Sequence, residues 1–139
     1  MRAKGFSVIE AVVASAILIV GLGSLAQLFV TSTRATGAAG ARSQAAILAA
    51  DKMEQLRTLA WTVDPAGLPA SDPALSASPS DALDRDVVGF SDQPGGWTRR
   101  WSVQPLAASP ADTIVVQVRV VAPGGAEARM TTVRTRRAN

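Results

Sequence analysis

Residues 4–30 read KGFSVIEAVVASAILIVGLGSLAQLFV, a basic start followed by one acid and a long apolar run. No charged side chain lies between Glu10 and Arg34, and residues 11–30 supply the roughly 20 apolar positions that a helix needs to cross a bilayer. Arg2 and Lys4 precede the run, and positive residues favour the cytoplasmic side of a membrane. The sequence therefore predicts one membrane-spanning helix, with the rest of the chain outside the cytoplasm.

Glu10 stands at the edge of this apolar run, where a carboxylate costs about 1–3 kcal/mol depending on its depth. Two simple alternatives are an uncleaved anchor and a secretory signal cut among the small residues from Ala35 to Ala41. Neither has a use for the acid, and the run exceeds the roughly 7–15 apolar residues of a secretory signal. Glu10 is therefore predicted to meet a partner charge.

The segment Lys4-Gly5-Phe6-Ser7-Val8-Ile9-Glu10 resembles the processing site of the type IV pilin family, in which Gly, an aromatic residue, a hydroxyl residue, two aliphatic residues and Glu follow one another. The basic leader before it and the apolar run after it also fit. The resemblance implies a leader of residues 1–5, cleavage between Gly5 and Phe6 by a prepilin peptidase, and N-methylation of Phe6 by the same enzyme. It is specific over residues 1 to about 30 and architectural beyond them.

The resemblance also implies a role for Glu10. Cleavage would place a positive amine on Phe6, about 6 Å away along a helix that rises 1.5 Å per residue. In filaments of the family the Glu meets the N-terminal amine of a neighbouring subunit. Because leaving either charge alone in apolar surroundings costs several kcal/mol, Glu10 is expected to form the salt bridge that sets the register of assembly.

The apolar helix, expected over residues 6–33, is followed by a second helical pattern over residues 42–61. Gly37 and Gly40 weaken the connection between the two without necessarily breaking it. Small and apolar residues of the second pattern recur at spacings of three and four, which predicts one buried stripe: Ala45, Ala49, Met53, Leu56 and Ala60. This stripe is expected to pack against a small sheet.

Residues 62–86 contain four prolines among Ala, Ser and Asp, and they predict an exposed connection with little to bury, in which partial disorder is equally open. Its acids are interpreted as solubilising residues. Strand patterns follow within residues 87–137, at 87–90, 97–104, 113–121 and 128–136. The expected fold is therefore α+β and pilin-like: a long N-terminal helix packed on an antiparallel sheet of three or four strands, within an extracytoplasmic head of residues 34–139.

The composition argues against enzymatic chemistry, because the chain contains no Cys and no His. Thiol nucleophiles, disulfides, imidazole bases and the usual zinc ligands are excluded, and no cofactor or metal is predicted. The run from Gly21 to Ala26 fits a dinucleotide-binding turn, but it follows no short strand and no acid stands about 20 positions on. A formal charge of +3, part of it in the leader, does not indicate nucleic-acid binding.

Two basic features leave alternatives open. Trp97, Arg99 and Trp101 share one side of a predicted strand, either as a ligand platform or, as we favour, as a core edge with the arginine stem between the rings. The arginines near the C-terminus form either a DNA- or lipid-binding edge or, as we favour, a like-charged edge that discourages aggregation: Arg129, Arg134, Arg136 and Arg137.

The resemblance predicts a minor pilin, most similar to the PilV type, that serves in the initiation or tip complex of a type IV pilus. The alternatives are a minor pseudopilin of the GspI type in a type II secretion system and, in another class, a DNA-binding or adhesive minor pilin. The implied partners are the inner membrane, a prepilin peptidase, and other minor and major pilins or pseudopilins, with nucleic acid not expected. The implied location is the bacterial inner membrane, single-pass with the head in the periplasm, and then the filament.

Overall fold

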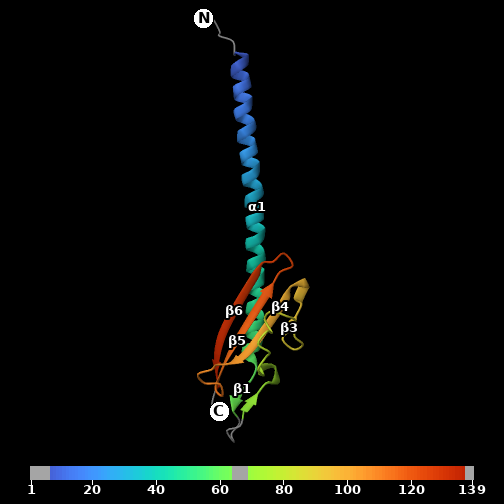
Figure 1. The fold of residues 1–139 in the computed structure, drawn as a ribbon, viewed down its shortest axis with the longest axis vertical. Coiled ribbons are helices and arrows are strands. Elements are labelled where there is room, and N and C mark those ends of the chain that lie inside the picture. The colour runs from blue at the N-terminus through green and yellow to red at the C-terminus, as the bar shows by residue number, and fades with distance from the viewer. Residues whose placement is uncertain (1–6, 64–68, 137–139) are drawn as a thin grey trace. The chain divides into compact units, whose positions relative to one another are not determined.

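The computed structural model describes residues 7–63 and 69–136, which form one long helix and two antiparallel sheets (Figure 1). The helix α1 (Val8–Thr58) is followed by a two-stranded sheet of β1 (Trp61–Val63) and β2 (Pro69–Ser71). A four-stranded sheet then follows in the order β3-β4-β5-β6. Its strands are β3 (Ser91–Asp92), β4 (Thr98–Pro105), β5 (Thr113–Val121) and β6 (Glu127–Thr135). The predicted α+β layout is confirmed.

The chain divides after Ala39 into two compact units, which we call the N-terminal unit and the C-terminal unit. Helix α1 belongs to both, and it is continuous through Gly21, Gly23, Gly37 and Gly40. Each of these glycines costs up to about 1 kcal/mol in a helix relative to Ala, so the flanking helix formers outweigh them. The two helical patterns of the sequence are therefore one element.

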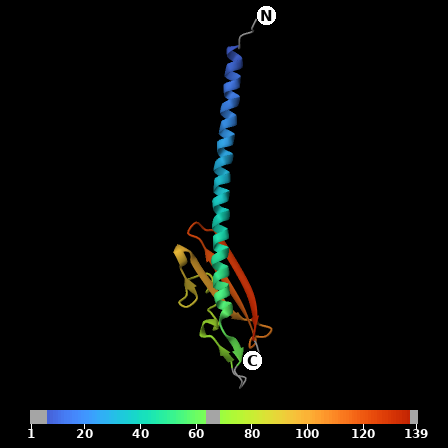
Figure 2. The ribbon, with the colours of Figure 1, turned by 180° about the vertical axis from the view of Figure 1, so that it is seen from behind.

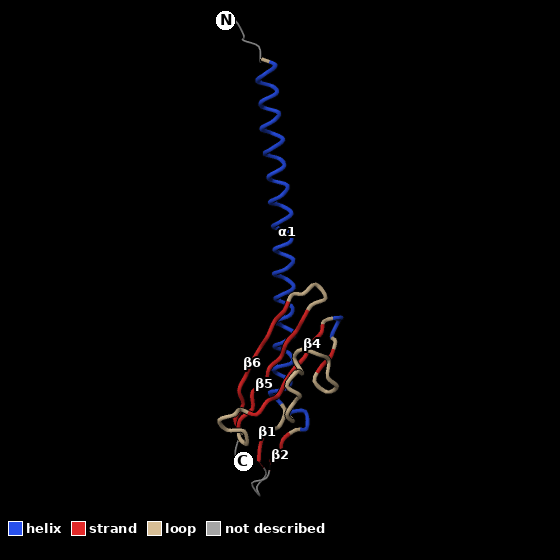
Figure 3. The backbone as a smooth tube through the Cα atoms, viewed as in Figure 1, coloured by secondary structure: helices blue, strands red, loops and turns tan. Residues whose placement is uncertain are grey.

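The four-stranded sheet is a meander in which neighbouring strands are also neighbours in sequence (Figure 3). Strand β5 lies at its centre and pairs with β4 from Ile114↔Pro105 to Val121↔Thr98. On its other side it pairs with β6 along its whole length. Gly125 lies in the turn between β5 and β6. Its φ of +82° is a backbone conformation that few residues other than Gly adopt. Short connections of this kind explain how so few residues build the sheet.

The core lies between the last turns of α1 and one face of this sheet (Figure 2). Four residues of the predicted stripe are buried, with Ala45 and Ala49 fully covered: Ala45, Ala49, Met53 and Leu56. They pack against alternate residues of β5, which face the helix because side chains alternate along a strand: Ile114, Val116, Val118 and Val120. The fifth predicted member, Ala60, is exposed, because the helix ends at Thr58 and not near residue 61.

The connection over residues 62–86, predicted to be exposed with little to bury, is partly buried in the stretch that the structure describes. Leu75 joins the main core, and Ala82 and Leu83 are buried as well. Strands β1 and β2 and a 3₁₀ helix (Pro73–Leu75) lie within the segment. The amino-acid composition of the segment did not predict this burial, because hydrogen bonds to the neighbouring strand hold the segment in place. A count of apolar residues does not reveal such bonds.

The strand expected at residues 87–90 is a turn instead, and pairing with β4 begins at Ser91. Val88 is 99% exposed and Gly89 has φ +83°, so the chain turns outward here. Only Phe90, the last residue of the expected strand, packs against the core. A short run of apolar residues does not distinguish a strand from a turn whose tip points into solvent.

Overpacking tests the contact between helix and sheet. Ala49→Leu adds a branched side chain where there is no free space, and it is expected to lower the free energy of unfolding of the C-terminal unit by about 1–3 kcal/mol. The measurement is a urea titration of the full chain in detergent micelles, followed by tryptophan fluorescence. Ala50→Leu, at the neighbouring exposed position, is the control and should change stability by less than about 0.5 kcal/mol. Equal losses in the two variants would contradict the packing.

Candidate functional site

The first candidate site is the surface of α1 in the N-terminal unit. Its large apolar side chains from Val8 to Val30 are exposed on every side of the helix. This stretch is long and apolar enough to cross a membrane, and none of it is buried within the chain. A helix that is apolar all round requires an apolar environment from outside the chain, either lipid or other helices.

Most of the hydroxyl groups on this part of the helix are hydrogen-bonded within it. Ser15 and Ser24 donate to the carbonyl oxygens of Ala11 and Val20, at 2.8 and 2.9 Å. Three threonines do the same with the carbonyl four residues earlier: Thr31, Thr33 and Thr36. Because an unsatisfied polar group in hydrocarbon costs several kcal/mol, these bonds adapt the helix to an apolar environment. The sequence analysis did not identify them, although hydroxyl residues in an apolar helix are their signal.

Glu10 lies in the first turn of α1, and its side chain is exposed. It makes no ion pair with any other residue that the structure describes. The predicted cleavage site at Gly5 and Phe6, with the N-methylation site at Phe6, lies outside the described residues. The structure therefore places the acid at the start of α1, before a stretch that has no other charged side chain until Arg34.

The second candidate site is a charged cluster that joins α1 to the beginning of the sheet. Arg99 on β4 is 7% exposed, and its guanidinium donates two hydrogen bonds to the carboxylate of Asp92, at 2.7 and 2.8 Å. A third nitrogen–oxygen contact, at 3.2 Å, reaches Asp51 on the helix. This arrangement satisfies a buried cation from two elements at once.

Lys52 completes the cluster. Its amine lies 3.5 Å from Asp92 and 3.6 Å from the centre of the Trp101 ring. The sequence analysis expected the arginine stem to pack beside Trp101, and Arg99 and Trp101 are indeed both buried. Lys52, Asp51 and Asp92 were not predicted as partners. The first two come from α1, far from the tryptophan in sequence, whereas Asp92 lies on the adjacent strand β3. The cluster attaches the helix to β3 and β4 and does not present Trp101 to a ligand.

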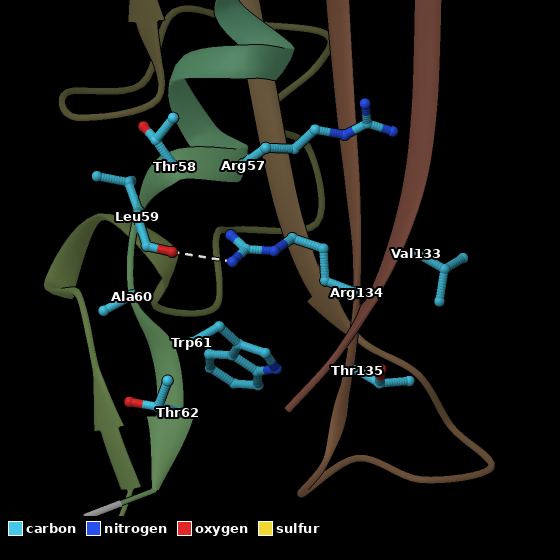
Figure 4. Close-up of a pocket in the computed structure, with 9 residues that line it drawn as sticks. All are labelled: Arg57, Thr58, Leu59, Ala60, Trp61, Thr62, Val133, Arg134 and Thr135. Atoms are coloured by element: carbon cyan, nitrogen blue, oxygen red, sulfur yellow. Dashed lines mark hydrogen bonds between the residues drawn. The ribbon is translucent and has the colours of Figure 1, made fainter. Parts of the chain in front are cut away.

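The basic C-terminal edge is largely engaged within the chain. Arg134 donates hydrogen bonds to the carbonyl oxygens of Leu56 and Leu59, at 2.7 and 2.8 Å, and so caps the end of α1. Figure 4 shows the bond to Leu59. The guanidinium of Arg136 stacks over the Trp61 ring at 4.4 Å. Arg129 is exposed, and Arg137 lies outside the described residues. Two of the four arginines thus contribute to the fold.

Two further arginines bind the segment before β3 to the outer face of the sheet. Arg119 on β5 contacts Asp84 at 3.0 Å and forms two hydrogen bonds with Glu127 on β6, which lower the pKa of Glu127. Arg100 on β4 binds Asp86 at 2.8 Å. Asp84 and Asp86 remain more than half exposed, so they are solvated as expected, but they also hold the segment in place.

A hollow of about 470 Å³ lies beside the end of α1, and Figure 4 shows the residues around it. Its walls are the last turn of the helix, strand β1 and the end of β6. Trp61, Arg57 and Arg134 are among the residues that line it, and none of its described lining residues is acidic. Within the described residues, no cluster of His, Cys, Asp or Glu is suited to hold a metal ion.

No protein-family model, curated protein or solved structure matches this chain.

The charged cluster makes a prediction about stability. Asp92→Asn keeps the size of the side chain but removes the charge that faces buried Arg99, and it is expected to lower the free energy of unfolding at neutral pH by about 1–3 kcal/mol. Urea titration of the full chain in micelles measures the change. Glu54→Gln breaks the exposed pair with Arg57 and is the control, with an expected change below about 1 kcal/mol. A larger loss of stability in Glu54→Gln than in Asp92→Asn would contradict the stabilising role assigned to the pair of Arg99 and Asp92.

The same cluster predicts a pH dependence. The hydrogen bonds from Arg99 lower the pKa of Asp92 below its ordinary value of 3.8, and the charges of Arg99 and Lys52 add to this effect. The stability from ionised Asp92 is therefore complete above pH 3.8 and is lost as the pH falls through the lower folded-state pKa. Stability curves measured between neutral and acidic pH should be flatter for Asp92→Asn than for the unaltered chain in this window. Parallel curves would show that Asp92 makes no such contribution.

Proposed function

We propose that this chain is a membrane-anchored structural subunit of the type IV pilin class, acting as a minor pilin that enters a filament through α1. The observation that carries the proposal is the single carboxylate of Glu10 in the first turn of a helix that is otherwise charge-free and apolar on every side as far as Arg34. Neither an ordinary anchor nor a secretory signal has a use for that acid.

The proposed assembly follows from the cost of isolated charges. In the membrane, Glu10 at the edge of the apolar run remains near water and headgroups. When α1 packs among other helices, the acid is taken into apolar surroundings and needs a cation, which the amine of a processed Phe6 on a neighbouring subunit supplies. A subunit shifted along its axis leaves both charges unpaired at a cost of several kcal/mol, so the pair selects one register.

The C-terminal unit supports a structural role. Its described ionic groups include several that hold elements of the fold together, such as Arg99 with Asp92 and Arg134 with the helix end. The engagement of Arg134 and Arg136 also weakens the alternative of a DNA-binding minor pilin, because free cations on one face are what phosphate contacts require. We accordingly place the subunit's function in assembly and propose no catalytic activity.

A minor pseudopilin of a type II secretion system uses the same chemistry of processing and helix packing, so it stays as the second proposal within the class. In either case the proposed location is the bacterial inner membrane, with the C-terminal unit in the periplasm until assembly. The other proposed partners are a prepilin peptidase and the major and minor subunits of the same filament.

The test uses the full chain expressed in cells with and without a prepilin peptidase. We expect mature protein that begins at Phe6 and carries one extra methyl group, only where the peptidase is present. N-terminal sequencing and the intact mass provide the measurement. A chain that begins at Met1 in both cells, or near residues 35–41, would overturn the proposal in favour of an anchor or a secretory signal.

Substitution of the acid tests the assembly step separately. Glu10→Gln is expected to insert into the membrane but to fall at least about tenfold in the filament fraction, because about 1.4 kcal/mol of lost pairing already corresponds to tenfold. Glu54→Gln removes an exposed acid from the same helix and should leave incorporation unchanged. Incorporation of Glu10→Gln at the normal level would contradict the salt bridge. Recovery with surface pili or with a secretion pseudopilus distinguishes the two machines.

A further inference from the structure

The outer side of β6 is an open sheet edge. In an antiparallel pair of strands, opposite residues alternate between hydrogen-bonded and non-hydrogen-bonded pairs. Ala122 N donates to Ala126 O, so the even-numbered residues of β6 are the ones that bond to β5. The N–H and C=O groups of the odd-numbered residues therefore point away from β5. No other described residue pairs with the backbone of Arg129, Thr131, Val133 or Thr135. Four consecutive bonding positions are open.

The opposite edge of the sheet is covered, which makes the open edge notable. N–H groups of β4 that point away from β5 are hydrogen-bonded to the preceding segment. Trp101 N donates to Phe90 O at 2.9 Å, and Val103 N donates to the Ser78 hydroxyl at 3.1 Å. Ser78 N in return donates to Val103 O at 2.9 Å. The chain thus protects one edge with the segment before β4 and leaves β6 without such a cover among the described residues.

Two hollows follow the seam between the open edge and α1. The hollow described above, about 470 Å³, borders Val133, Arg134 and Thr135. A second hollow of about 330 Å³ borders Met130 and Thr131 and is walled on the other side by residues of α1 from Ala50 to Arg57. Arg57 borders both. Together they form a groove between a helix and an edge strand, which we call the β6 groove.

The charges along the β6 groove favour an acidic occupant. Arg57 donates a hydrogen bond to the Thr132 hydroxyl on β6 at 3.2 Å, and about half of its side chain is exposed. Figure 4 shows this side chain extending from α1. Exposed Arg129 lies further along the strand. Among the described acids near the strand, Glu127 is bound by Arg119, and Glu54 is mostly exposed, with a 3.5 Å contact to Arg57. Asp112 lies at the far end of β6, where its carbonyl oxygen accepts a hydrogen bond from Arg136 N. The edge therefore presents more cation than anion to an approaching chain.

We propose that the β6 groove binds an extended, acidic segment of another protein chain, which adds to the sheet as a fifth strand. Its backbone bonds to the open groups of Thr131, Val133 and Thr135, and alternate side chains enter the two hollows. An acid of the segment meets Arg57. Bonds to the main chain would supply affinity and the hollows selectivity, as in other cases of strand addition. The inference does not depend on the assembly role proposed above.

The probe is a capped eight-residue peptide of alternating Asp and Val, long enough to span the groove at about 3.3 Å per residue. It is added to the full chain in micelles, and amide hydrogen exchange is followed by NMR. We expect exchange at Thr131 and Val133 to slow at least tenfold, with no change at Thr132 and Met130, whose N–H groups already bond to β5. The matched Lys and Val peptide should give no protection.

Val133→Pro is the decisive variant. It removes an outward N–H but no bond to β5, and proline is tolerated at such a position on an edge strand. We expect at least a tenfold loss of affinity for the acidic peptide with an unchanged unfolding midpoint. Val133→Thr keeps the N–H and should bind normally. Arg57→Gln, measured alongside, keeps the strand edge intact and should weaken binding of the acidic peptide at low salt.

Each other outcome overturns the proposal. Equal protection by the Lys peptide would exclude an acidic occupant, and no protection by either peptide at millimolar concentration would exclude strand addition. Normal binding to Val133→Pro would place the peptide elsewhere. If Val133→Pro is unfolded, the protection pattern decides: slowing of all neighbouring amides alike, without alternation, contradicts an added strand. Protection without peptide that rises with protein concentration would assign the groove to a second copy of this chain.

Discussion

The C-terminal unit depends on the close approach of α1 to β5, which two alanines permit. Ala45 and Ala49 are fully covered, and larger residues at Met53 and Leu56 fill the space as the helix continues toward its end. Opposite them, every second residue of β5 is a buried aliphatic. A small sheet has too little apolar area to be stable alone in water, so the helix provides the other half of its core. Every other stabilising feature of the unit is arranged around this contact.

The charged groups are distributed around that contact in a consistent way. The Arg99 cluster ties the helix to β3 and β4, while Arg134 satisfies the carbonyl groups that the helix leaves free at its end. Arg100 and Arg119 hold the preceding segment on the outer face of the sheet. The chain has no cysteine and so no disulfide. Arg99 and Arg119 each pair bidentately with a nearby acid and also contact a second acid far along the chain, Asp51 and Asp84 respectively.

The two units of the chain meet opposite physical demands along one helix. Up to Arg34 the surface of α1 is apolar and most of its hydroxyl groups are bonded internally, so it fits surroundings without water. Beyond Gly40 the same helix is amphipathic and contributes to a water-exposed domain with an ordinary core. The proposed assembly role uses the first part, whereas the β6 groove belongs to the second. The two proposals therefore concern different parts of the chain, and neither requires the other.

Local pattern determined the helix, its buried stripe and the central strands, because periodicity and a long charge-free run depend on neighbours in sequence. It also singled out Glu10, whose position within the apolar run needs no tertiary information. The end of the helix, the order of residues 69–86, the partners of Arg99 and the open edge of β6 were decided only by tertiary structure. Several of these depend on groups tens of residues apart, such as Leu56 with Arg134 or Asp51 with Arg99, and no local pattern encodes which distant group will satisfy a buried charge or a free carbonyl.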